Sequence, residues 1–225
     1  MKRIVRRITV LAGSIIAMNQ AAAVPIWIDF TDSTWSSASD QLSFSQSYAG
    51  VDVTVAVTGG GLLTFNADEA RSATAELEHF ALGGDGIGVR DDEIGAGETV
   101  EVSFSSNVTV LGYALFNLFD GEGPDGVSER ADSLFVTASG STAHAGYGSA
   151  VGGAGLYWSG LLDVVNVSKA SFWAGNLNAP WSDFALAGML IDDGTEAVTA
   201  VPEPSMLVLF ASGLLAVGLR RKFTR

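Results

Sequence analysis

The sequence predicts an all-β domain, a β-sandwich of the jelly-roll type, that occupies residues 24–194. Short runs of alternating or β-branched residues recur along this stretch, and Gly, Ser, Asn and Asp separate them. Regular helical patterns do not alternate with these runs, which argues against an α/β fold. No period of 20–50 residues indicates a propeller or a solenoid. The stretch is long enough to form one domain with its own hydrophobic core.

Individual strands follow from the same patterns. Residues 51–57 alternate, with valine at every second position, and three glycines at 59–61 end the run. Val100, Val102 and Phe104 share one face of a strand, and residues 108–116 resemble a strand that is buried on both faces. One short helix is expected at residues 67–80, which are rich in Ala and Glu. The remaining predicted strands are 26–30, 42–48, 62–65, 133–138, 156–158, 170–173 and 184–191.

Charge and composition exclude several classes of protein. The chain has 25 acidic and 12 basic residues, and only Arg71, Arg90, Arg130 and Lys169 lie between the two basic termini. Such an acidic domain is a poor partner for nucleic acid, which needs clustered Lys and Arg, whereas cations and neutral sugars remain suitable partners. The absence of cysteine excludes disulfides, thiolate metal sites and cysteine nucleophiles.

The N-terminus has the layout of a secretory signal peptide, residues 1–23. A charged segment at 1–7 precedes an apolar core at 8–18, and Ala21, Ala22 and Ala23 form a site for signal peptidase. The alternatives, a buried N-terminal helix or an uncleaved membrane anchor, are disfavoured because the apolar core is too short to span a bilayer and the small-residue site follows it at once. Export of the protein is the expectation.

The C-terminus, residues 201–225, has a second tripartite layout after a short linker at 195–200. Pro202, Glu203 and Pro204 precede an apolar run at 206–219, and a basic cluster follows. As a helix this run would measure about 21 Å, short against a hydrocarbon core of about 30 Å, and the basic cluster would stay in the cytoplasm. A recognition site followed by a short removable hydrophobic tail is also the layout of a GPI signal. A plain C-terminal anchor is the alternative.

These C-terminal residues resemble the PEP-CTERM sorting domain of bacteria that make exopolysaccharide. The resemblance implies that exosortase, a membrane protease-transpeptidase, cuts near Pro202, Glu203 and Pro204. It also implies that the C-terminal transmembrane helix holds the protein in the inner membrane until processing, after which the protein reaches the cell surface or the extracellular matrix. The resemblance implies nothing about a ligand.

Residues 83–94 contain the strongest candidate for a metal site. Their glycines allow close backbone approach, and Asp85, Asp91, Asp92 and Glu93 supply the hard oxygen ligands that Ca²⁺ prefers. The run from 86 to 104 also resembles one found in PEP-CTERM ectodomains, although Gly95 stands where an acidic residue is expected. In jelly-roll carbohydrate-binding modules, acids near the first and last strands share a structural calcium ion. That resemblance adds Asp183, with Asp29 as its partner; ordinary acidic loops are the alternative.

Tryptophans suggest a second kind of site. The flat faces of exposed tryptophans stack on sugar rings, and Trp173 and Trp181 lie near Asn176 and Asn178 in the sequence. These two tryptophans are therefore candidates for contact with a glycan such as exopolysaccharide. Tryptophans are often buried, so packing in the core is the alternative.

Catalysis has little support in the sequence. His79 and His144 stand in no metal or triad motif, and both are expected at the surface. We therefore expect a protein that is not an enzyme and that has a structural or adhesive role in the exopolysaccharide matrix or biofilm. A calcium-stabilised carbohydrate-binding module is the alternative. An extracellular glycoside hydrolase is a weaker one, because it needs two carboxyl groups that face each other across a cleft.

Overall fold

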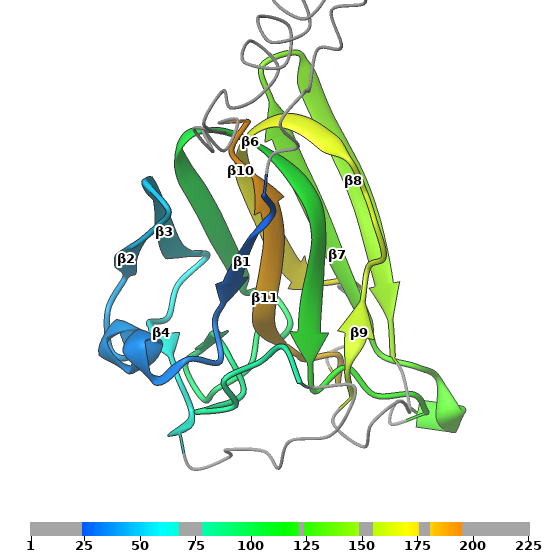
Figure 1. Ribbon diagram of the computed structural model, residues 1–225. Helices are drawn as coiled ribbons and strands as arrows, with labels where there is room; N and C mark the ends of the chain where they lie inside the picture. The colour runs from blue at the N-terminus through cyan, green and yellow to red at the C-terminus, as the bar shows by residue number, and fades with distance from the viewer. Residues whose placement is uncertain (1–23, 68–77, 122–123, 149–154, 176–180, 195–225) are drawn as a thin grey trace, which may run out of the picture. The chain divides into compact units, whose positions relative to one another are not determined.

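The computed structural model describes residues 24–67, 78–121, 124–148, 155–175 and 181–194 (Figure 1). Residues Ala23–Thr195 form a compact unit of their own. The expected signal peptide, linker and sorting signal lie outside the described residues, as does most of the helix expected at 67–80. Among the residues that are described, no helix is long and apolar enough to cross a membrane.

The unit is built from antiparallel strands, which confirms the all-β, sandwich-type prediction. The main sheet has the order β1-β11-β6-β10-β7-β8; the β2–β3 hairpin and the short β9 join it along β6, and β4 pairs with β5. Two short 3₁₀ helices, η1 and η4, accompany the strands. The elements are β1 Ile26–Asp29, η1 Ser33–Ala38, β2 Ser43–Tyr48, β3 Val51–Thr58, β4 Leu63–Thr64, β5 Gly88–Val89, β6 Thr99–Phe116, η4 Pro124–Gly126, β7 Arg130–Thr137, β8 Gly140–Tyr147, β9 Tyr157–Trp158, β10 Val164–Ala174 and β11 Ala185–Asp192.

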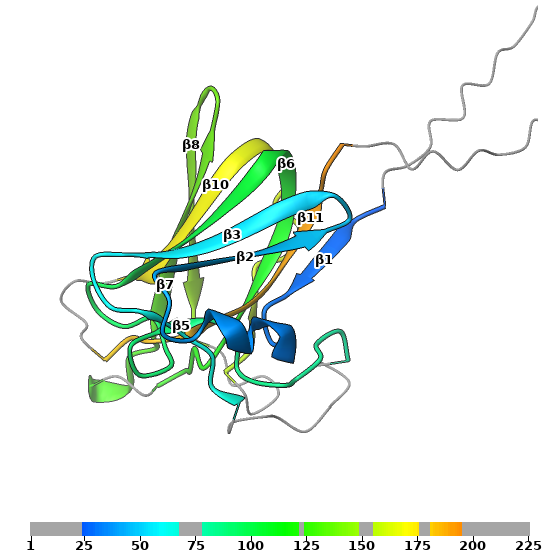
Figure 2. The same cartoon turned by 90° about the vertical axis from the view of Figure 1, so that its left-hand side faces the viewer.

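Strand β6 joins the two halves of the fold. Its first part, up to Phe104, pairs with β3 and with the last residues of β10. Its last part pairs with β11, with β9 and with the first residues of β10. Between these parts Ser105, Ser106 and Asn107 are exposed, and the register with β10 shifts. A bulge of this kind bends a strand, so one strand can serve two layers (Figure 2). The sequence indicated two separate strands here, because the three polar residues interrupt the apolar pattern.

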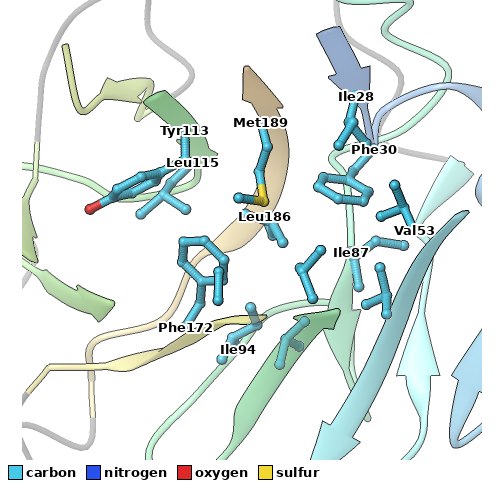
Figure 3. Packing of buried hydrophobic residues seen from close by; sticks show 14 of the residues in the cluster. Ile28, Phe30, Val53, Ile87, Ile94, Tyr113, Leu115, Phe172, Leu186 and Met189 are labelled. Atoms are coloured by element: carbon cyan, nitrogen blue, oxygen red, sulfur yellow. The ribbon is translucent and has the colours of Figure 1, made fainter. Parts of the chain in front are cut away.

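The core lies between the layers and follows the predicted alternation. Val51, Val53 and Val55 are buried whereas Asp52 is exposed. Figure 3 shows Phe172, Tyr113 and Met189 among the apolar side chains that fill the interior. All three are fully buried. The core is therefore made by alternate residues of strands that are distant in the sequence, as in other sandwiches.

Besides β6, β5 and the two 3₁₀ helices, three parts of the chain differ from the sequence-based expectation. Residues 78–80, the described end of the expected helix, form a turn and a bend. Strand β8 was not predicted, because Gly140–Tyr147 consists of small and polar residues on an exposed edge and shows no apolar alternation. Strand β10 begins at Val164, six residues before the predicted start, because Val165, Asn166 and Ser168 are exposed along its first part.

Replacement of Phe172 by alanine tests the core. Its ring lies 5.2 Å from that of Tyr113 and 6.3 Å from that of Phe135, centroid to centroid. We expect Phe172→Ala to lower the free energy of unfolding by about 3–5 kcal/mol, because it removes a large buried side chain and leaves a cavity. Urea denaturation measures the change. Val165→Ala, at a position that is 55% exposed, is the control and should change stability by less than about 0.5 kcal/mol; equal losses in both variants would contradict this core.

Candidate functional site

Three acidic side chains from distant parts of the sequence meet near the end of the domain where β6 ends and β11 begins (lower part of Figure 1). The Asp183 side chain makes hydrogen bonds to the carboxyl groups of both Glu93 and Glu129. The Glu129 carboxyl also accepts the backbone N–H of Phe119 at 2.6 Å, and that of Asp183. We call Glu93, Glu129 and Asp183 the carboxyl cluster.

Backbone hydrogen bonds hold the three contributing segments together. The Ile94 N–H donates to the Phe184 carbonyl at 2.6 Å, which ties the residue after Glu93 to the residue after Asp183. The Arg130 N–H donates to Ser182 Oγ at 3.2 Å, and this contact ties the start of β7 to the same loop. The cluster is therefore fixed by the main chain of its loops and not only by its side chains.

A tight turn presents Glu93 to the cluster. The Val89 N–H donates to the Glu93 carbonyl at 3.0 Å and closes the turn. Within this turn Arg90 has φ 63° and Asp92 has φ 139°, backbone conformations that residues other than glycine rarely adopt. Gly88 is needed here because a Cβ at this position would overlap the Asp92 carbonyl group. The Gly-rich run in the sequence thus serves the backbone of this turn.

The environment of the cluster favours protonated carboxyl groups. Burial, together with the neighbouring Asp183 carboxylate, raises the pKa of Glu93 to about 8. Burial also raises the pKa of Glu129 to about 7, and Asp183 adds to that rise. The pKa of Asp183 is raised by burial and by the negative charges of Asp91 and Asp92. Close carboxyl groups cannot all ionise in a poorly solvated site, so they share protons.

The other metal candidates lie around the cluster with different partners. Asp85 is buried and accepts a hydrogen bond from Asn117 Nδ2 at 3.0 Å, and the Asn117 side chain also bonds to the Glu93 carboxyl. Asp92 accepts a hydrogen bond from Asn66 Nδ2 at 2.9 Å, whereas Asp91 is exposed. Two members of the network, Glu129 and Asn117, were not predicted. Asn117 directly follows the strand predicted at 108–116, and Glu129 lies in the loop before the strand predicted at 133–138; the sequence gives no further signal for either residue.

Asp29, the expected calcium partner of Asp183, makes its hydrogen bonds to Thr31 and Ala81. Its carboxylate accepts the Thr31 N–H at 2.9 Å, the Thr31 hydroxyl at 2.7 Å and the Ala81 N–H at 2.6 Å. These bonds close the turn after β1 and attach the segment that precedes Leu82. Asp29 therefore has a structural task at this turn.

As the side chains lie, no three His, Asp or Glu residues in the described part of the chain are grouped so that they could hold a metal ion. The donor chemistry nonetheless suits a hard cation, because the cluster offers oxygen atoms alone, as Ca²⁺ prefers. Asn117 adds a side-chain amide next to Glu93. A cation would have to replace hydrogen bonds that now join the carboxyl groups.

The two tryptophans proposed for glycan contact are both half-buried. Trp173, on β10, lies opposite Asp132 in the register with β7 and lines a shallow cavity of about 260 Å³ with Arg130 and Asp132. Trp181 has a buried Nε1 atom without a hydrogen-bond partner in the described part of the chain. Asn176 and Asn178, the expected polar neighbours, lie outside the described residues.

The two histidines differ in their surroundings. His79 is exposed and lies 3.6 Å from Glu78, as expected. His144 is half-buried, and its Nδ1 lies 2.8 Å from the hydroxyl group of Tyr113, to which Ser133 Oγ also donates at 3.3 Å. The expectation that His144 lies at the surface is wrong, because β8 pairs it directly with Ser133 and turns its ring towards Tyr113.

Together these observations define a β-sandwich protein with an acidic loop cluster at one end of its domain. Residues 200–222 match the PEP-CTERM protein-sorting motif, and the match includes Pro202, Glu203 and Pro204. The chain thus carries the sorting signal of an exosortase substrate, an exported protein that is sorted to the cell surface. No curated protein and no solved structure is similar enough to this chain to count as a match.

The raised pKa values predict how stability depends on pH. Unfolded glutamates titrate near about 4.3, so the folded state binds more protons than the unfolded state up to about pH 8. The stabilisation from these groups is complete below the unfolded pKa and is lost as the pH rises through about 7 and 8, the pKa values of Glu129 and Glu93. We expect the free energy of unfolding, measured with urea and a chelator, to fall as the pH rises from about 5 to 9.

Glu93→Gln should reduce this slope because it removes the group whose pKa is raised to about 8. Glu78→Gln is the matched control, since the Glu78 side chain is 67% exposed, and its slope should equal that of the unchanged protein. Equal slopes in both variants would show that the cluster does not govern this pH range.

Proposed function

We propose that this exosortase substrate is a non-catalytic, structural or adhesive component of the exopolysaccharide matrix or biofilm at the cell surface. The sorting motif at residues 200–222 carries the proposal, because it supports export and sorting to the cell surface, where a matrix component would act. The composition of the domain agrees with this role. An excess of acidic residues keeps a protein soluble and leaves cations or neutral polymers as its natural contacts.

The contacts of the acidic residues support a role other than catalysis. Glycoside hydrolases place two carboxyl groups about 5–9.5 Å apart across a cleft, so that the sugar fits between them. Here Glu93 and Glu129 both hydrogen-bond to Asp183, which leaves no room for a substrate between neighbouring carboxyl groups. His144 is engaged by Tyr113 on the core side of the sheet. These arrangements fit a structural task better than acid–base chemistry.

The sorting motif can be tested by substitution. We expect replacement of Pro202, Glu203 and Pro204 by alanine to leave a longer precursor in the membrane fraction, because exosortase would no longer recognise its site. Immunoblots of membrane, surface and medium fractions measure size and location. Glu196→Ala, just upstream of the motif, should be processed normally. A variant of the three motif residues that is shortened and sorted like the unchanged protein would contradict the proposal.

A second candidate function is that of a calcium-stabilised carbohydrate-binding module. The observation that favours it is the convergence of Glu93, Glu129 and Asp183, all oxygen donors, with the Asn117 amide beside them. In this proposal Ca²⁺ binds to the carboxyl cluster and fixes its loops. The half-buried Trp173 and Trp181 contact the glycan. The polar pair of Arg130 and Asp132, 2.8 Å apart, lies beside Trp173 and offers hydrogen-bonding groups to sugar hydroxyls.

Thermal unfolding with Ca²⁺ tests this second function. Extracellular sites commonly bind Ca²⁺ at about 10⁻⁴–10⁻³ M, so about 5–10 mM should raise the melting temperature by several degrees relative to a chelator. Asp183→Asn should abolish the rise, because it removes the charge of the residue that contacts both glutamates. Asp52→Asn, at an exposed position on β3, should keep it. If Ca²⁺ does not raise the melting temperature of the unchanged protein, this second function is contradicted, and the matrix role stands without a metal ion.

A further inference from the structure

A second cluster of aromatic residues lies on the outer face of the sheet, away from the main core. It surrounds a cavity of about 640 Å³ that is lined by Trp27 of β1, Trp158 of β9, Phe80, Leu156, Ala114 and Leu190. The side chains of Ala114 and Phe116 belong to this outer cluster, whereas those of Tyr113 and Leu115 belong to the main core. The cavity is therefore separate from both the core and the carboxyl cluster.

Gly112 and Gly188 allow the indole rings of two tryptophans to lie directly on the sheet. A Cβ at Gly112 would lie 2.7 Å from Trp158 Cη2, and a Cβ at Gly188 would lie 2.7 Å from Trp27 Cζ2. Both distances are too short for any side chain at these positions. Glycine in the middle of a strand weakens the sheet and commonly marks a close approach. Strands β6 and β11 thus carry glycine where the two tryptophans approach the sheet.

The rings of the cluster are inclined to one another. Trp27 and Phe80 lie 5.3 Å apart at 76°, and Trp27 and Trp158 lie 5.9 Å apart at 50°, centroid to centroid. Trp158 is 42% exposed, so the cavity opens to solvent on its side. Rings that meet at steep angles form walls rather than a flat platform.

Two acidic side chains, Asp29 and Glu78, lie next to residues that line the cavity. In the part of the chain that the structure describes, neither Lys nor Arg lines the cavity, and His79 is its one basic group. The Asp29 carboxylate bonds to the N–H of Ala81, next to Phe80, and Glu78 pairs with His79. The described Lys and Arg side chains pair with acids elsewhere, in the pairs Arg90–Glu98, Arg130–Asp132 and Lys169–Glu101.

We propose that this cavity binds a methylated ammonium group, an organic cation with an apolar surface. The faces of Trp and Phe attract such cations, and methyl groups suit an apolar lining. A sugar would leave most of its hydroxyl groups without partners here, and a metal ion would lack oxygen ligands. An anionic group would find no Lys or Arg among the described lining residues. The chemistry of the cavity therefore favours a quaternary ammonium over a sugar, a metal ion or an anion, independently of the proposed matrix function.

Choline and its neutral isostere 3,3-dimethylbutanol provide the decisive comparison, because they have the same shape and differ in charge. The exported protein, labelled with ¹⁵N and recovered from the cell envelope, is titrated with each compound and with glucose, and the indole N–H signals are followed by NMR. We expect choline to shift the Trp158 signal saturably and to bind about tenfold more tightly than the isostere. Equal binding of both compounds, preferential binding of glucose, or no binding of choline would each overturn the proposal.

Variants locate the site. Trp158→Ala should weaken choline binding at least about tenfold, whereas Trp158→Phe should keep most of it because an aromatic face remains. Trp158 is 42% exposed and lies outside the main core, so neither change should unfold the protein. Tyr147→Ala, on β8 and 56% exposed, removes an aromatic ring outside this cavity; it is the control and should bind like the unchanged protein. Full binding by Trp158→Ala, or its loss in Tyr147→Ala, would contradict this location.

Discussion

The pairing of β6 with four other strands is the constraint on which the rest of the structure depends. Its first part pairs with β3, its last part pairs with β11 and β9, and β10 pairs with both parts. In that last part, alternate residues serve different purposes. Tyr113 and Leu115 face the core, whereas Gly112 and Ala114 face the aromatic cavity. Asn117, the residue after the strand, reaches the Asp85 and Glu93 side chains. One strand therefore positions the core, the cavity and part of the carboxyl cluster.

An element could be predicted from the sequence when its pattern of apolar and polar residues lies within the element itself. The alternation at residues 51–57 predicted β3, because the valines of that strand face the core and the residues between them do not. The edge strand β8 carries no such signal, since neither of its faces needs apolar residues. The continuity of β6 through Ser105, Ser106 and Asn107 arises from pairing with strands far away in the sequence, which a local pattern does not record.

The same reasoning explains why the sequence indicated some residues of the carboxyl cluster and the aromatic cluster but not others. Acidic residues in a Gly-rich loop pointed to Glu93, and the residue before the last strand pointed to Asp183; the structure joins these two. Glu129 and Asn117 enter the network through the topology alone, because their loops meet only after the sheet has formed. Likewise Trp27 and Trp158 became a pair through the adjacency of β1, β11, β6 and β9, whereas sequence neighbours had suggested Trp173 and Trp181.

Different parts of the chain have different tasks. The C-terminal motif is the sorting signal, whereas the domain is an acidic, cysteine-free sandwich with the carboxyl cluster in its loops and the aromatic cluster on its outer face. The most direct test of this account is the mass of the protein recovered from the cell surface, with both ends mapped by mass spectrometry. The account predicts a chain that starts near Val24 and has lost the apolar run at residues 206–219. A surface protein that still contains this run would contradict it.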